Sequence, residues 1–343
     1  MPLARCVLPQ YPHGDRAVPV QYLGAAGGFS GAEVWQLAAP SGALCLRGGP
    51  PGALDPARWA WIHAQLARIA DAGCRLVPQA LPTRSGATWV AYGGRLWELS
   101  PWLAGTADYR QAPTQDRLVA AMQSVALLHR CARRGPAGRS GPASSPSLIQ
   151  RCRLMEQLEA GLGDELGRAA RRQASPELMP RARLILEHYR RCATEVLREV
   201  RAAARRHTPL QVCHGDLWHD HVLFSGPRVT GLVDFAAMKT DARALDIARL
   251  LGSLVQDDRP GWEIGLAAYE QMEPLSDDER ALIPVFDRSC VLLSGMNWLR
   301  WLLLERREFA DRQRVLQRLD TIIVRMAAMQ QLGDGPSGTL GCD

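Results

Sequence analysis

Short runs of alternating apolar and polar residues near the start of the chain predict an antiparallel sheet. Three of these runs are separated by Gly-rich or Ser-Gly turns, at Val18–Leu23, Glu33–Leu37 and Ala43–Arg47. Apolar positions then recur at helical spacing from Pro56 to Ala72. Residues Thr88–Leu99 return to a strand pattern with a Gly-Gly turn inside it. The pattern therefore predicts a small N-terminal β lobe over residues 1–99.

Beyond residue 100 the pattern is mostly helical. The segment Ser100–Ala107 is interrupted by Pro101 and Gly105, so we predict that it links two lobes. Helical periodicity covers residues 114–133, 148–207 with an interruption near 174–180, and 242 to about 331. A larger, mainly helical C-terminal lobe is therefore expected over residues 100–332. We expect the Gly- and Ser-rich residues 333–343 to be a disordered tail.

Three short apolar runs stand between the helical stretches of this second lobe. They are joined by tight turns, and their pattern predicts strands at Leu210–Cys213, Val222–Phe224 and Val229–Val233. The whole pattern indicates an α+β protein with no internal repeat.

Composition places the chain among globular proteins. Of its 343 residues 47% are hydrophobic and 22% charged, which is too apolar for a disordered chain. No apolar run near the start is as long as that of a signal peptide, and no later apolar run is long enough to span a membrane. We therefore expect a soluble, cytoplasmic protein without a membrane partner. Nine dispersed cysteines without a C-x-x-C pair indicate reduced thiols rather than a disulfide framework or a zinc site.

The charge pattern argues against nucleic acid as a partner. The formal net charge is +6, but the cations are spread along helical segments with acidic neighbours and form no basic block. We expect no polynucleotide ligand, and either a monomer or a homodimer. Lys239 is the only lysine, so an arginine can be expected where chemistry usually employs lysine.

Two polar stretches, Val212–Phe224 and Thr230–Ala236, carry the candidate chemistry. Phosphoryl transfer needs a carboxylate that takes the proton of the acceptor hydroxyl, oxygen ligands for a metal ion, and cations on the phosphates. Asp216 lies on a loop after a strand, and Asp234 leaves another strand 18 residues later. This spacing predicts Asp216 as the base and Asp234 as a metal ligand.

These stretches resemble those of a known family. His214-Gly215-Asp216, followed by a strand and by Val233-Asp234-Phe235, resembles the H-G-D-x-x-x-x-N and D-F-G-like motifs of the aminoglycoside phosphotransferase, choline kinase and homoserine kinase superfamily. The resemblance covers roughly residues 18–260 and implies a protein-kinase-like fold. It also implies transfer of the γ-phosphoryl group of ATP to a hydroxyl of a small molecule, with Mg²⁺ or Mn²⁺. The acceptor classes are an amino alcohol, a sugar, homoserine or an aminoglycoside-like compound.

The resemblance assigns further residues by their place in the motif order. The loop Gly24–Glu33 resembles the one over the ATP phosphates, and Trp97–Gly105 resembles the hinge. His214 is implied to pack beneath the catalytic loop. The resulting nucleotide-binding candidates are Gly27, Gly28, Ser30, Arg47, Trp97 and Glu98.

Three positions depart from the family pattern. His221 stands where the family has Asn as a second metal ligand, and imidazole suits zinc or manganese better than magnesium. Arg47 replaces the usual lysine but stays cationic and can fork onto phosphate oxygens. Ala236 replaces a glycine or an acidic residue. The changes at His221 and Ala236 leave a second hypothesis open, in which the protein is a pseudokinase that binds nucleotide without turnover.

A metal-dependent hydrolase is the other alternative. His214, Asp216, His219, Asp220 and His221 crowd within eight residues. A chelating site usually needs further ligands from elsewhere, and the sequence has no second histidine cluster. Plainer roles also stand beside the kinase assignments: Asp216 as a turn cap, Arg47 in a surface salt bridge, and Glu98 with Trp97 as ordinary strand residues. Candidates for an acceptor pocket are Trp262, Glu263, Tyr269, Glu270, Trp298, Arg300 and Trp301, and for each Trp interior packing is the alternative.

Overall fold

The computed structural model describes residues 2–14, 17–24, 31–52, 55–134, 139–309 and 311–333. The chain forms two compact units, each built from more than one stretch of sequence. Unit 1 contains residues 1–139, 211–240 and 263–274, and unit 2 contains residues 140–210, 241–262 and 275–343. Both motif stretches therefore fall entirely in unit 1, and only the first three residues of the strand that leads into them, 208–210, belong to unit 2. The boundary at residue 99 inferred from the pattern stays a prediction.

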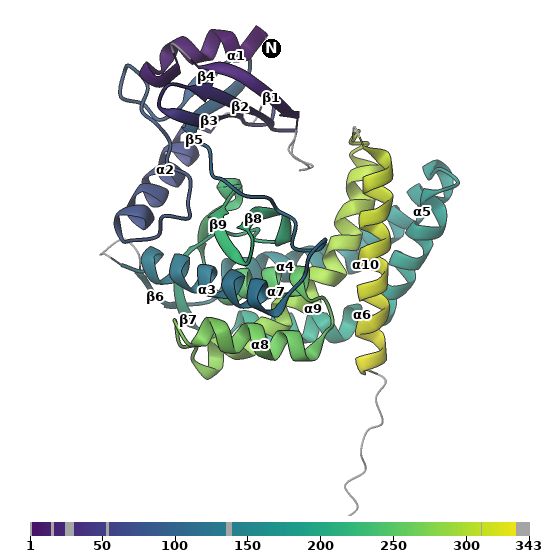
Figure 1. Cartoon of the computed structure of the whole chain (residues 1–343). Coiled ribbons are helices and arrows are strands. Elements are labelled where there is room, and N and C mark those ends of the chain that lie inside the picture. Colours follow the sequence, from purple (N-terminus) through teal and green to yellow (C-terminus); the bar gives the residue numbers. More distant parts are fainter. Residues whose placement is uncertain are drawn as a thin grey trace, which may run out of the picture. The chain divides into compact units, whose positions relative to one another are not determined.

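The N-terminal part of unit 1 is a five-stranded antiparallel sheet, as the alternating pattern predicted. Its strands are ordered β1-β2-β3-β5-β4 (Figure 1). Their bounds are Val18–Gly24 for β1, Glu33–Ala39 for β2, Gly42–Gly48 for β3, Val90–Tyr92 for β4 and Arg95–Pro101 for β5. In the pairing of β3 with β5, Arg47 lies directly opposite Glu98. Strand β5 extends two residues beyond its predicted end at Leu99.

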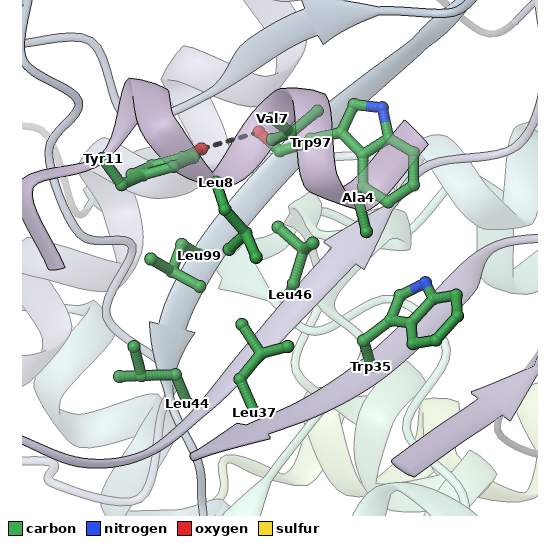
Figure 2. Close-up of a cluster of buried hydrophobic side chains, with 10 residues drawn as sticks. All are labelled: Ala4, Val7, Leu8, Tyr11, Trp35, Leu37, Leu44, Leu46, Trp97 and Leu99. Atoms are coloured by element: carbon green, nitrogen blue, oxygen red, sulfur yellow. Dashed lines mark hydrogen bonds between the residues drawn. The ribbon is translucent and has the colours of Figure 1, made fainter. Parts of the chain in front are cut away.

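One face of this sheet is buried under the N-terminal segment of the chain. That segment forms helix α1, Pro2–Val7, and the short 3₁₀ turns Leu8–Gln10 and Pro12–Gly14. Figure 2 shows their apolar side chains against alternate strand residues, and the cluster comprises Ala4, Val7, Leu8, Tyr11, Trp35, Leu37, Leu44, Leu46, Trp97 and Leu99. The Tyr11 hydroxyl donates a hydrogen bond to the Trp97 carbonyl at 2.9 Å. Since side chains alternate across a strand, the residues between these positions, Arg47 and Glu98 among them, point to the other face.

The rest of unit 1 supplies two helices and the motif segments. Helix α2, Pro56–Asp71, is capped at its N-terminus by Asp55, whose side chain accepts the Arg58 N–H at 2.9 Å. Helix α3, Gln115–Ala132, begins in the same way at Thr114. The motif segments contain the hairpin of β8, Val222–Ser225, and β9, Arg228–Leu232, with the short 3₁₀ turns His219–His221 and Phe235–Ala237 on either side.

Three short strands lie at the boundaries between the stretches of the two units. They are β6, Arg139–Ala143, β7, Thr208–Cys213, and β10, Lys239–Asp241. The apolar pattern predicted β7 but neither β6 nor β10, because Arg-Ser-Gly-Pro-Ala in β6 and Lys-Thr-Asp in β10 contain no alternation of large apolar and polar residues.

Unit 2 is helical, as predicted for this part of the chain. Within it α6 packs against α4, α9 and α10 (Figure 1). Its helices are α4 Pro146–Gln157, the π-helical turn Leu158–Leu162, α5 Gly163–Gln173, α6 Leu178–Ala204, α7 Ala244–Leu254, α9 Asp277–Leu299, the π-helical turn Arg300–Leu304 and α10 Arg312–Gly333. Helix α8, Arg259–Glu270, carries residues of both units. The break between α5 and α6 confirms the predicted interruption. Among the residues described, no helix is long and apolar enough to cross a membrane.

Candidate functional site

A sharp turn after β7 starts the loop that carries Asp216. Gly215 has φ +87°, and a Cβ at this position would overlap the carbonyl oxygen of Ala237. Glycine is required here for both reasons, because other residues rarely adopt this φ and no side chain fits against that carbonyl. The turn brings Asp216 to the segment that follows β9, and so toward the second motif.

His214 joins the two motif segments. Its ring is fully buried and lies 4.4 Å, centroid to centroid, from the ring of Phe235. Its Nε2–H donates to the Val233 carbonyl at 2.9 Å, so Nδ1 is free to accept the Asp216 N–H at 3.4 Å. The imidazole therefore fastens the main chain of Asp216 to the residue just before Asp234.

Asp234 presents an ionised carboxylate next to a cation. Its backbone is left-handed, with φ 63°, and Arg47 Nη2 donates to Oδ1 at 2.8 Å. Burial raises the pKa of the Asp234 carboxyl, but Arg47 and His221 more than offset this, so the pKa lies below its usual value. About a third of the side chain, 36%, is exposed. An accessible carboxylate of this kind fits a divalent ion that prefers oxygen ligands.

His221 has both of its ring nitrogens engaged. Nδ1–H donates to the Asp216 carbonyl at 2.9 Å, and Nε2 accepts the indole N–H of Trp218 at 3.0 Å. Burial, followed by the neighbouring His214, lowers the pKa of His221 to about 4, so the ring is neutral at pH 7. Although Nε2 lies 3.6 Å from Oδ2 of Asp234, its only lone pair already faces the Trp218 donor. These contacts do not fit a second metal ion at His221, whose assignment as a ligand stays a prediction.

Arg47 lies between two carboxylates. Besides the bond from Nη2 to Asp234, its Nη1 lies 3.4 Å from Oε1 of Glu98. Its guanidinium carbon lies 5.9 Å from the ring centre of Trp59. Glu98 is held in turn by His63 of α2, whose Nε2 is 2.6 Å from Oε2. Burial raises the pKa of Glu98, but the His63 hydrogen bond and Arg47 bring it below its usual value, so this carboxylate is charged as well.

These residues face a cavity of about 350 Å³ within unit 1. Val34 and Cys45 border it from the sheet, Ile62 from α2 and Trp102 from the predicted linker. Apolar walls with a few charged groups at one side are typical of a site for a small organic molecule.

The structure brings four of the residues singled out in the sequence to one cavity. Arg47, Glu98, His221 and Asp234 line the cavity, whereas Asp216 is half-buried beside it and is not part of its lining. Trp97 lies in the apolar cluster on the other face of the sheet, where its indole N–H donates to the Tyr92 carbonyl at 3.0 Å. Its side chain does not reach the cavity, so a role in nucleotide binding stays a prediction without support from this geometry. Gly27, Gly28 and Ser30 fall outside the described residues.

Three contributors were missed by the sequence analysis: His63, Trp59 and Trp218. The helical pattern of residues 56–72 placed the first two on a helix, but nothing in it pointed to a site. Trp218 lies inside the motif stretch, so its position was a signal that could have been used.

The metal-dependent hydrolase gains nothing from this arrangement. Among the residues that the structure describes, His214, Asp216, His219, Asp220 and His221 do not bring three ligand atoms to one point. His219 instead lies 3.3 Å from the Asp220 carboxylate, and His214 and His221 are bound to main-chain carbonyls.

Comparison with known proteins identifies what this chain is similar to. The model of the phosphotransferase enzyme family matches residues 22–283. A homoserine kinase of Gluconacetobacter diazotrophicus is 27% identical over 241 residues, which are 68% of this chain and 66% of that protein. A homoserine kinase of Gluconobacter oxydans is 37% identical over 97 residues, 26% of this chain and 31% of that protein. The matches thus span less than two thirds of the length of these relatives.

Solved structures similar to the chain show its fold. An aminoglycoside phosphotransferase from Alicyclobacillus acidocaldarius superposes with a TM-score of 0.62 at 16% identity, covering 96% of this chain and 95% of the other. A microcompartment-associated aminopropanol kinase gives 0.62 at 18% identity, with 94% of both chains covered. A choline/ethanolamine kinase family protein from Mesorhizobium loti gives 0.57 at 18% identity, covering 96% and 98%. The α+β, kinase-like fold expected from the motifs is thereby confirmed.

Proposed function

Because the chain belongs to the phosphotransferase enzyme family, we propose that it transfers the γ-phosphoryl group of ATP to a hydroxyl of a small molecule. The observation that carries this proposal is the bridge made by His214, which ties the main chain of Asp216 to the residue before Asp234. The two carboxylates that the transfer needs therefore belong to one hydrogen-bonded assembly, with Arg47 on the second of them.

Each of these side chains has a part in the transfer. Asp216 orients the acceptor hydroxyl and takes its proton as the oxygen bonds to the γ-phosphorus, while the bond from that phosphorus to the bridging oxygen breaks and ADP leaves. Arg47 donates to the phosphate oxygens, for which its planar fork is suited. Asp234 holds a divalent ion, Mg²⁺ or Mn²⁺. Such an ion, when bound, neutralises charge on the phosphates.

The class of acceptor is proposed from the activities of the similar proteins, which include a homoserine kinase and an aminopropanol kinase. Homoserine and aminopropanol both carry a primary or secondary hydroxyl and an amino group, so hydroxylated amines are the first class to test. Aminoglycosides follow, since an aminoglycoside phosphotransferase shares the fold, and sugars are the remaining class expected from the motifs.

The test is a transfer assay with purified protein and Mg-ATP. Homoserine, aminopropanol, ethanolamine, choline and an aminoglycoside are added singly, and the phosphorylated product is identified by phosphorus NMR and mass spectrometry. We expect one class to give a product, and the Asp216→Asn protein to give almost none. Binding of Mg-ATP without product from any acceptor would instead favour the pseudokinase, and absence of both would contradict the proposal.

A further inference from the structure

Arg47 contacts two carboxylates, and the one that lies outside the motif segments comes from the sheet and not from the neighbouring helix. In protein kinases a glutamate of the helix packed on the sheet pairs with the phosphate-binding cation. Helix α2 contains no glutamate, and its only carboxylate is Asp71, its last residue. Glu98 of β5, directly opposite Arg47 in the strand pairing, makes the contact instead, with Oε1 3.4 Å from Nη1.

Helix α2 nevertheless contributes to the same group of contacts. His63 is buried, with Nε2 2.6 Å from Oε2 of Glu98 and Nδ1 2.7 Å from the hydroxyl of Thr88. A neutral ring with its proton on Nε2 satisfies both contacts, since it donates to the carboxylate and accepts from the hydroxyl. A chain of hydrogen bonds therefore runs from Thr88 through His63 and Glu98 to Arg47.

This chain matters because Arg47 has a second carboxylate within reach. At 2.8 Å, the contact to Asp234 is the shorter of its two ion pairs, the one to Glu98 being 3.4 Å. When Asp234 binds a metal and nucleotide together, Arg47 has to turn toward the phosphates while a negative group still anchors it. Glu98 can anchor Arg47 because His63 fixes the other carboxylate oxygen of Glu98. The Glu98 carboxylate therefore keeps its position when Arg47 leaves Asp234.

We propose that Glu98, fixed by His63, replaces the helix-borne glutamate of protein kinases and holds Arg47 in the geometry that binds the nucleotide's phosphates. Glu98 is thus a positioning residue that acts through Arg47, and not a hinge residue that contacts the base. The proposal rests on the proposed function, because it assumes that the cavity binds ATP.

Titration calorimetry with Mg-ATP and with adenosine tests the proposal. The Glu98→Gln protein should bind Mg-ATP on the order of tenfold more weakly, as expected for a lost charged hydrogen bond, and adenosine as tightly as the parent. His63→Phe should weaken Mg-ATP in the same direction, and His63→Gln, which keeps a donor, should restore part of it. Glu273→Gln is the matched control. It removes another buried carboxylate of unit 1, paired with Arg133, and should leave both affinities unchanged.

A double-mutant cycle separates positioning from a general loss of structure. If Glu98 acts through Arg47, then Glu98→Gln should have no further effect on Mg-ATP affinity in an Arg47→Met background. Equal effects in both backgrounds, or equal losses of ATP and adenosine affinity, would overturn the inference while leaving the proposed function intact. If the parent transfers phosphate and the Glu98→Gln variant binds Mg-ATP as tightly as the parent, the inference is likewise overturned and the proposed function stands. A parent that binds no Mg-ATP would overturn both.

Discussion

At the scale of single residues, Asp216 is held through its main chain. Its N–H is bound by His214 and its carbonyl by His221, so a change of the carboxylate leaves both bonds in place. We therefore expect Asp216→Asn to unfold at the same temperature as the parent and to bind Mg-ATP equally well. Its turnover number should fall by about 10² to 10⁴, the usual contribution of a general base. Parent-like turnover would exclude Asp216 as the base.

Asp234 differs because its carboxylate itself makes the contacts. Asp234→Ala removes the proposed metal ligand and one of the two anions around Arg47. Calorimetry should show loss of Mg-ATP binding in this variant. Asp71→Ala, which removes an exposed carboxylate at the end of α2, is the control and should bind like the parent. Equal affinity of the Asp234→Ala protein and the parent would show that the ion is held elsewhere.

The lowered pKa of His221 predicts a pH dependence of stability. As pH falls from about 6.5, the imidazole in the unfolded chain takes up a proton first, while the buried ring stays neutral until about pH 4. Stability is therefore lost as pH falls through this window, by up to about 3 kcal/mol. Denaturant unfolding should show this loss in the parent relative to His221→Asn, which cannot titrate. Parallel pH profiles of the two proteins would mean that His221 titrates normally.

At the scale of elements, the turn between β7 and the catalytic loop depends on glycine. Gly215→Ala combines a left-handed φ with a clash against the Ala237 carbonyl, so we expect about 1–3 kcal/mol of lost stability and a displaced Asp216. Gly226, in the β8–β9 turn, also has a positive φ, 59°, but no atom lies near its added Cβ. Gly226→Ala should therefore cost only the backbone penalty of about 1–2 kcal/mol in unfolding experiments and keep full turnover. Equal turnover of the two variants would contradict this account of the turn.

At the scale of the whole molecule, the proposed nucleotide contacts all belong to unit 1. A ligand at about one hundred times its dissociation constant stabilises a folded protein by about 2.7 kcal/mol. We expect Mg-ATP to raise the unfolding temperature and, in hydrogen exchange, to protect residues 211–240 of unit 1 more than α6 of unit 2. Protection confined to α6 would place the nucleotide elsewhere.

Among the residues described there is no membrane-spanning helix, but the cytoplasmic location, the absence of nucleic acid and the oligomeric state stay predictions.

The sequence by itself determined most of the elements with their order, though not α1, β6 or β10, and the central pair of carboxylates. Strand and helix periods are local properties, so they predicted β1 to β5, α2, α3 and the helices of unit 2. The two motifs lie within 21 residues, His214 to Asp234, and the pattern placed Asp216 before the β8–β9 hairpin and Asp234 directly after it.

Only the tertiary structure decided which neighbours these residues have. Trp97 and Glu98 look alike as consecutive strand residues, yet alternation sends the first to the apolar cluster and the second to the cavity. The strand register, set by long-range hydrogen bonds, put Glu98 opposite Arg47. His63 reached Glu98 from a helix 35 positions earlier, a contact that depends on how α2 packs against the sheet and that no local pattern encodes.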